Sequence, residues 1–216
     1  EHRSYLEGEL QELGVEKNVT LVINDWGSGL GFDWANRHRE AVKRICYMEA
    51  FVRPFEHIDN WGEAKAMFEG MRSERGEQMV LEENFWIEQL LPMDIIRDLE
   101  PDEFDEYRRP FLSAGEDRRP TLTFPREIPI GGSPTDVHEA MSSYSEWMAT
   151  NDLPKLFINA EPGALLGGEE REFCRTWKNQ TETTVKGIHF IQEDSPDEIT
   201  KALGQWLHTT ARTRDS

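Results

Sequence analysis

The spacing of apolar residues along the first 50 positions predicts an alternation of helices and strands. Apolar side chains recur at helical spacing over Tyr5–Leu13, and Gly14 follows as a stop signal. The run Val19–Ile23 is continuous, β-branched and apolar, which is typical of a strand buried on both faces. A helix over about Leu30–His38 and a strand over Val42–Ala50 are predicted next. This order of elements predicts a parallel α/β sheet.

The pattern changes between Phe55 and about Pro129. Helical stretches separated by Pro and Gly predict an all-helical insertion. Two interpretations of its aromatic residues stay open: they form the insertion's own core, or some of them line a pocket under a lid. These residues are Trp61, Phe68, Phe85, Trp86, Phe104, Tyr107, Phe111 and Phe124.

Alternating elements return after the insertion. A helix is predicted around Val137–Met148, strands over Lys155–Asn159 and Thr181–Val185, and a closing amphipathic helix over Asp197–His208. The sequence contains no internal repeat and no linker long enough to separate independent domains. We therefore expect an α/β core made of residues 1–54 and 130–216, and a helical segment made of residues 55–129.

Composition and charge narrow the function classes. The 216 residues, 37% of them hydrophobic, supply a core for one globular domain. A formal charge of −18 repels nucleic-acid phosphates and anionic lipid headgroups, so neither partner is expected. No apolar run approaches the roughly 18 residues that span a bilayer, and no leader peptide opens the chain. Cys46 and Cys174 lack metal-binding spacing, and we expect buried thiols in a reducing, cytoplasmic compartment.

A candidate nucleophile lies between the first predicted strand and the helix that follows it. Asp25, followed by Trp26 and Gly27, occupies the position of a nucleophile elbow, a tight turn that presents its side chain at the carboxyl edge of a sheet. A carboxylate is ionised at neutral pH and attacks an sp³ carbon without a base. The alternative is that Asp25 only caps the following helix.

Two further candidate residues lie at or just after the carboxyl ends of predicted strands. Glu49 lies at the end of the Val42–Ala50 strand, where open α/β sheets carry functional groups. His189 lies in the loop after the last strand, the place of the catalytic base in α/β-hydrolases. A lone His is more often a structural hydrogen-bonding residue than a base. The order of Asp25, Glu49 and His189 nevertheless predicts that all three meet at one edge of the sheet.

Four runs carry a family resemblance: VINDWGSGLGFDWANRHREAVKRICYMEA, RRPTLTFPREIPI, LPKLFINAEPGAL and GIHFIQEDSPDEI. They resemble the haloalkane dehalogenases of the α/β-hydrolase superfamily, in the subgroup whose catalytic acid follows the sixth strand. They are also similar to the coelenterazine luciferases of the sea-pansy type, which share that scaffold. The likeness extends from about His2 to about Leu207. It implies an α/β-hydrolase fold, a mostly parallel sheet flanked by helices, with residues 55–129 as an all-helical cap.

The resemblance implies roles for individual residues. Asp25 matches the family's nucleophile, Glu49 its catalytic acid and His189 its base. Trp26 matches the tryptophan that donates its indole N–H to the departing halide. The family's pocket-lining positions fall on Phe68, Trp86, Phe124, Pro125, Ala164, Leu165 and Phe190.

The implied reaction has two steps and requires neither a metal nor an organic cofactor. Asp25 displaces halide from a small halogenated hydrocarbon to form an alkyl ester, and water activated by His189, which Glu49 holds, hydrolyses that ester to alcohol. The expected partners are therefore the haloalkane, the halide ion and water. Two alternatives stay open: a coelenterazine-luciferase-like monooxygenase on the same scaffold, and a truncated inactive relative.

The sequence departs from the family at two places. Asn24 stands where the family's elbow usually has His, a change expected to have a modest effect. The chain opens on Glu1 and not on Met, and we expect it to begin partway through a larger protein. The family's first four strands, its His-Gly-x-Pro turn and the Asn that is its second halide donor have no counterpart. We expect Val19–Ile23 to be an open edge that pairs with a second copy, with a separate N-terminal piece, or in aggregates.

Overall fold

The computed structural model describes residues 1–212, with the side chains of residues 60, 63 and 212 left out. The helices and strands alternate as the sequence predicts, and short 3₁₀ and π-helical segments (η) lie among the central helices. In chain order the elements are α1 (His2–Glu12), β1 (Val19–Asn24), α2 (Asp25–Arg37), β2 (Val42–Ala50), η1 (Asp59–Trp61), α3 (Glu63–Arg72), η2 (Glu77–Glu82), η3 (Trp86–Leu90), α4 (Leu91–Met93), α5 (Pro101–Arg108), η4 (Arg109–Phe111), η5 (Glu116–Arg118), α6 (Arg119–Glu127), α7 (Thr135–Thr150), β3 (Lys155–Pro162), α8 (Gly168–Arg175), β4 (Gln180–Gly187), α9 (Ile191–Asp194) and α10 (Pro196–Arg212).

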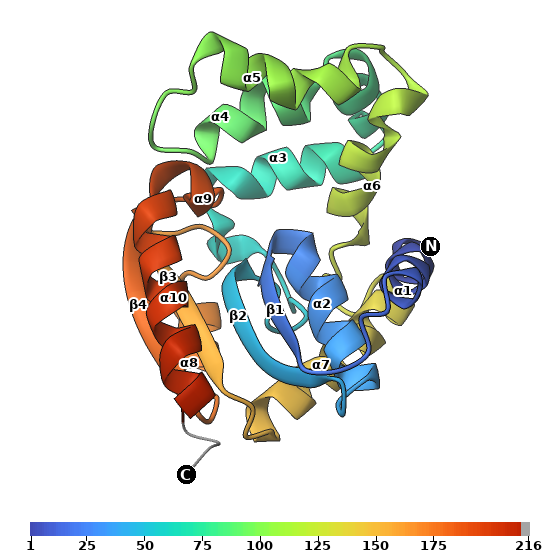
Figure 1. The fold of residues 1–216 in the computed structure, drawn as a ribbon. Coiled ribbons are helices and arrows are strands. Elements are labelled where there is room, and N and C mark those ends of the chain that lie inside the picture. Colours follow the sequence, from blue (N-terminus) through green and yellow to red (C-terminus); the bar gives the residue numbers. More distant parts are fainter. Residues whose placement is uncertain (213–216) are drawn as a thin grey trace. The chain divides into compact units, whose positions relative to one another are not determined.

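The chain forms two compact units (Figure 1). The first unit contains Glu1–Arg53 and Glu139–Ser216, and holds the strands β1 to β4 with their flanking helices. The second unit, Pro54–His138, consists mainly of the helices α3 to α6 and the η segments. The role of residues 55–129 as a cap stays a prediction.

The sheet of the first unit is parallel, and its strands follow one another in the order β1-β2-β3-β4. The register pairs Ile23 with Tyr47 and Met48 with Ile158, so the strand ends align. In a parallel sheet every carboxyl end lies at the same edge, which is where ligands bind in open α/β folds. The predicted parallel α/β architecture is confirmed.

The two central strands are buried on both faces, because helices cover each side of the sheet. Cys46 and Met48 of β2 point to one face, where they join a cluster that includes Trp206 of α10. Tyr47 points to the other face, where its ring stacks on Phe157 of β3 at 5.1 Å. Phe32 of α2 packs against Tyr47 with ring centroids 5.8 Å apart. Side chains of a strand alternate between faces, so this pattern places α10 and α2 on opposite sides of the sheet.

The first strand differs from the prediction of burial on both faces. β1 pairs only with β2 in the described sheet, and Val22 is 48% exposed. Helix α1 contributes no buried residue beside it. The expected open edge is therefore present, whereas the pairing of this edge with another chain stays a prediction.

Helix α2 begins at Asp25, five residues before the predicted start at Leu30. At Gly31 the reason for glycine is packing. A Cβ on Gly31 would lie 2.9 Å from Cγ2 of Ile23, so the helix approaches β1 too closely for a side chain. Helix α8 was not predicted, because its Gly-Gly-Glu-Glu start resembles a loop and it buries only Cys174.

The second unit has a core of its own, formed by Met71, Met79, Val80, Leu81, Leu90 and Leu122. Phe68, Phe85 and Trp86 pack against this core partly buried, as the core interpretation of the aromatic residues predicts for these three. Arg118, 8% exposed, donates to the carbonyl oxygens of Leu81 and Glu82 and so joins two helical segments.

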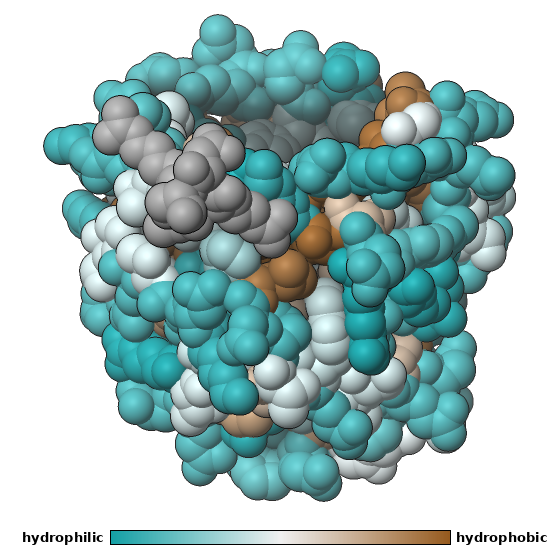
Figure 2. Space-filling view, turned by 60° about the horizontal axis from the view of Figure 1, so that its bottom comes forward, coloured by the Kyte–Doolittle hydropathy of each residue, from teal (hydrophilic) through white to brown (hydrophobic). Residues whose placement is uncertain are grey.

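The visible surface is mostly hydrophilic (Figure 2). In the space-filling view hydrophilic residues predominate on the visible face, and apolar groups are small and scattered (Figure 2). Within residues 1–212, every helix is too short or too polar to cross a lipid bilayer.

Candidate active site

The turn between β1 and α2 has the geometry of an elbow. Asp25 has φ of +42°, a left-handed conformation that is costly for a residue with a side chain. Asn24 occupies the N-cap position of α2, so Asp25 is not the cap that the alternative interpretation proposed. The buried hydroxyl of Ser28 donates to the Asp25 carbonyl oxygen and accepts from the backbone N–H of Phe51. Ser28 therefore ties the elbow to the chain that follows β2.

The structure brings Asp25, Glu49 and His189 together within the first unit. Nε2 of His189 lies 3.5 Å from Oδ1 of Asp25, and Nδ1 lies 3.3 Å from Oε2 of Glu49. Glu49 is fully buried and His189 is 7% exposed, whereas the Asp25 side chain is 30% exposed. The imidazole thus lies between an accessible carboxylate and a buried one.

Glu49 is held by backbone amides of the loop after β3. Its Oε2 accepts from the N–H of Ala164 at 3.1 Å and of Leu165 at 2.7 Å. Its Oε1 accepts from the N–H of Leu166 at 3.4 Å. Hydrogen bonds from backbone amides stabilise the ionised form of a carboxylate, so this loop lets a charged Glu49 be buried.

The two carboxylates govern the charge of His189. Burial acts most strongly and favours the neutral imidazole, but hydrogen bonds and charges from Asp25 and Glu49 together outweigh it. The pKa of His189 is therefore raised well above its usual value near 6.5. The two carboxylates therefore favour the protonated, positively charged form of the imidazole.

Of the other residues predicted from the sequence, four lie in the first unit beside these groups. Trp26 follows Asp25 and packs on Phe51 with ring centroids 4.9 Å apart. Phe190 packs edge-on against His189, also at 4.9 Å. Ala164 and Leu165 supply two of the amides to Glu49.

The remaining predicted pocket positions lie in the second unit. Phe68 is in α3 and Trp86 in η3, both against that unit's core. Phe124 and Pro125 lie in α6. The role of these four residues in lining a pocket stays a prediction.

Sequence reasoning missed the residues that support the acidic members of the site. Gly163 and Leu166 act through their own backbone, and Ser28 acts through its hydroxyl on the backbone of Asp25 and Phe51, so none of the three forms a motif of charged residues. Gly163 was quoted within a family run, but its φ of +75° could be anticipated only from the Pro162-Gly163 pair, a turn signal.

A parallel sheet with an acidic elbow after one strand, an acid at the carboxyl end of the next and a histidine after the last defines an α/β-hydrolase. Comparison with known proteins makes the assignment narrower: the chain belongs to the haloalkane dehalogenase family, whose members are hydrolases. The family assignment from the sequence is confirmed.

Two haloalkane dehalogenases support this conclusion, and a monooxygenase is also similar to the chain. A haloalkane dehalogenase of Sphingobium indicum is 53% identical over 207 residues, which are 96% of this chain and 70% of the relative. The coelenterazine h 2-monooxygenase of Renilla reniformis is 41% identical over 210 residues, 96% of this chain and 67% of the relative. The crystal structure of an ancestral haloalkane dehalogenase superposes with a TM-score of 0.92 at 36% identity and covers 97% of this chain and 74% of that chain. No protein-family model matches the sequence.

Proposed function

We propose that this chain hydrolyses haloalkanes to alcohol and halide through an alkyl ester on Asp25. The observation that carries the proposal is the imidazole of His189 between the carboxylates of Asp25 and Glu49, in a chain of the haloalkane dehalogenase family. Because Asp25 is the exposed member, it is the group that meets the substrate.

In the first step Asp25 attacks the carbon that bears the halogen. An oxygen of its carboxylate forms a bond to that carbon, and the carbon–halogen bond breaks with its electron pair leaving on the halide. Trp26, next to the nucleophile, donates its indole N–H to the departing halide. A donor aimed at a developing anion in a site that excludes water lowers the barrier more than it would in solution.

In the second step water attacks the carbonyl carbon of the ester. Esterification removes the negative charge of Asp25, which is one of the two charges that raise the pKa of His189. The imidazolium then loses its proton to solvent. The neutral imidazole accepts a proton from the attacking water as the water oxygen bonds to the ester carbon, and Glu49 stabilises the imidazolium that forms. Collapse of the tetrahedral intermediate breaks the bond between the acyl carbon and the alkoxide oxygen, and the alkoxide takes the imidazolium proton and leaves as alcohol. The Asp25 carboxyl group then loses its proton to solvent and is a carboxylate again.

The test is bromide release from 1-bromobutane by the purified 216-residue chain, with intact mass recorded on the same sample. Asp25→Asn is expected to abolish release, whereas the exposed Asp98→Asn serves as a matched control and retains it. His189→Gln is expected to release one bromide per protein and to gain the mass of one butyl group, because only the second step needs the base. Release that persists in Asp25→Asn would refute the proposal.

A second candidate is favoured by the coelenterazine monooxygenase relative at 41% identity. On this alternative the same three residues serve light-emitting oxidation of coelenterazine. Light emission without bromide release would support the monooxygenase. Neither activity, in folded protein of the correct mass, would support the truncated inactive relative.

A further inference from the structure

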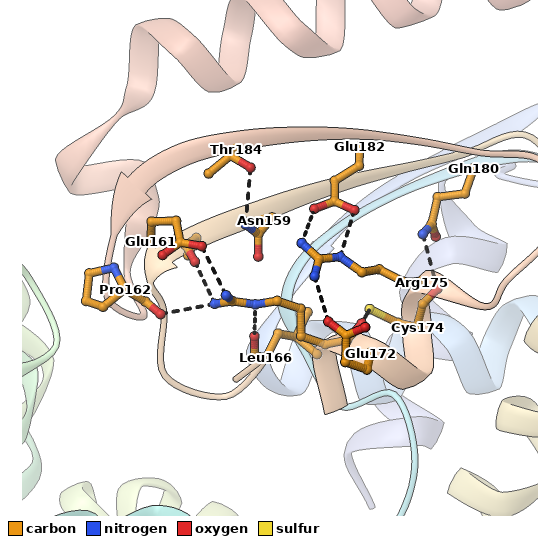
Figure 3. A network of polar contacts seen from close by, with 12 residues as sticks. Asn159, Glu161, Pro162, Leu166, Glu172, Cys174, Arg175, Gln180, Glu182 and Thr184 are labelled. Carbon is orange, nitrogen blue, oxygen red and sulfur yellow. Dashed lines mark hydrogen bonds and ion pairs between the residues drawn. The ribbon is translucent and has the colours of Figure 1, made fainter. Parts of the chain in front are cut away.

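The loop that holds Glu49 is itself held from behind by one arginine, Arg171 of α8. Nε of Arg171 donates to the Leu166 carbonyl oxygen at 2.9 Å, and Nη2 donates to those of Ala160 at 2.9 Å and Pro162 at 3.0 Å. Nη1 contacts the carboxylate of Glu161 at 3.1 Å. The network appears in Figure 3, where Pro162, Leu166 and Glu161 converge on this guanidinium.

These contacts bracket the segment that faces Glu49. Pro162 and Leu166 are the ends of a five-residue turn, and the amides of residues 164–166 inside it point to the carboxylate. A planar guanidinium that binds both ends fixes the width of the turn, because its donors have a rigid fork geometry. The Arg171 side chain is 15% exposed, so little water competes for these carbonyl oxygens.

Gly163 allows the Arg171 guanidinium and the Glu49 carboxylate to approach the same point of the loop. A Cβ at this position would lie 2.9 Å from Nη2 of Arg171, 3.3 Å from Oε1 of Glu49 and 2.9 Å from the Ala160 carbonyl oxygen. The guanidinium and the buried carboxylate therefore flank a residue without a side chain. The positive charge of Arg171 acts on Glu49 in addition to shaping its loop.

Helix α8 is anchored a second time, to the chain after β2. Arg53 binds the carboxylate of Glu170 with two hydrogen bonds of 2.8 and 3.0 Å, and its guanidinium lies 4.9 Å from the ring centre of Phe173. One face of α8 thus connects the segment that follows Glu49 with the loop that binds Glu49.

We propose that Arg171 is a positioning residue, which keeps the 162–166 loop in the shape that orients Glu49 and, through it, His189. The catalytic part of this inference rests on the proposed hydrolysis. Glu49 and His189 act in the second step, so loss of Arg171 slows ester hydrolysis and leaves displacement of halide by Asp25 nearly unchanged.

The test compares Arg171→Gln and Arg171→Lys with Arg175→Gln. Arg175 is one turn further along α8 and binds Glu172 and Glu182, but it has no contact with the loop, so it controls for the loss of an arginine from this helix. Misplacement of a catalytic group commonly costs about 10- to 100-fold, and we expect a fall in kcat within that range for Arg171→Gln, with kcat/KM changed less than about threefold. The butyl ester should accumulate by intact mass, and Arg171→Lys should recover part of kcat.

A measurement without substrate separates this inference from the proposed function. A proton on Nδ1 of His189 faces Oε2 of Glu49 and is expected to give a downfield proton NMR signal. This signal should shift or broaden in Arg171→Gln and stay in place in Arg175→Gln. If the native chain releases no bromide but the signal responds in this way, the proposed hydrolysis fails and the positioning role stands. If Arg171→Gln behaves like Arg175→Gln in both signal and kcat, the positioning role is wrong. Should Arg171→Gln not fold, Arg171→Lys with an unchanged signal and kcat also overturns it.

Discussion

The buried carboxylate of Glu49 offers the sharpest test of how this site is built. In Glu49→Gln one carboxylate oxygen becomes an NH₂ group of nearly the same size, so the packing is retained and the charge is lost. If the remaining oxygen takes the place of Oε2, it still accepts from Ala164, Leu165 and His189. The new NH₂ group then faces the N–H of Leu166, and two donors oppose each other.

The expected loss of stability follows from these contacts. A hydrogen bond to a charged group contributes about 1.5–3 kcal/mol and a neutral one about 0.5–1.5 kcal/mol, so the three retained bonds lose roughly 3 kcal/mol together. The unpaired N–H of Leu166 adds about 1 kcal/mol, since its present bond is already long. Burying an amide costs less than burying a carboxylate, which offsets part of this sum. We expect a net decrease of about 2 kcal/mol in the free energy of unfolding at neutral pH.

The way in which this loss of unfolding free energy depends on pH tests the charge of His189 more directly than its total size does. A histidine with a raised pKa stabilises the folded state fully below its unfolded pKa of about 6.5, and this contribution is lost as pH rises through the folded pKa. Glu49 is one of the two groups that raise the pKa of His189. The penalty of Glu49→Gln should therefore be largest between about pH 5 and about pH 6.5, and should shrink at higher pH.

Urea unfolding of the native chain and of Glu49→Gln across this pH range measures the penalty directly, with exposed Glu198→Gln as the control. The steady-state rate of bromide release, after the first turnover, should fall by about 10³-fold or more in Glu49→Gln, the scale of losing the acid of a hydrolytic triad. A penalty that is constant with pH, or that grows toward alkaline pH, would refute the assignment of His189 as an imidazolium shared by two carboxylates.

Two further predictions concern backbone and buried charge. Gly163→Ala places a Cβ at φ of +75° and 2.9 Å from a carbonyl oxygen, and should lower the free energy of unfolding, measured with urea, by about 2 kcal/mol. Gly204→Ala in α10, with nothing within 4 Å, should raise it by about 0.5–1 kcal/mol, and equal effects of the two changes would contradict the packing argument. The Nζ of Lys155, a fully buried residue, has four oxygen atoms within hydrogen-bond distance for its three N–H groups, and burial lowers its pKa to about 8. Between about pH 8 and the unfolded pKa near 10.4, the lysine binds more protons in the unfolded chain than in the folded one. The free energy of unfolding should therefore rise with pH, by up to about 1.4 kcal/mol per pH unit. This rise should be absent in Lys155→Met, and its persistence there would contradict the lowered pKa of Lys155.

Much of the first unit could be predicted because its strands carry a strong local signal. The apolar runs around Ile23 and Ile45 are continuous, and their alternation with helices leaves a parallel sheet as the simple solution. Once the sheet is parallel, residues after successive strands must lie at one edge. That is why Asp25, Glu49 and His189 could be brought together from the sequence, although their distances could not.

The parts that could not be predicted are those in which a residue acts on the backbone of another segment. Gly14 ends a helix, Gly31 lets a helix approach a strand and Gly163 lets two charged groups approach a loop, yet all three are the same letter in the sequence. Arg171 and Arg175 likewise sit four residues apart on one helix with similar neighbours. Only the fold shows that the first binds three carbonyl oxygens around the Glu49 loop while the second binds two surface carboxylates. The side chains expected to do the chemistry can be predicted from the sequence, because charged residues and histidine are unusual at strand ends. The residues that position them can be identified only from the folded structure, because they act on backbone atoms that are distant in the sequence.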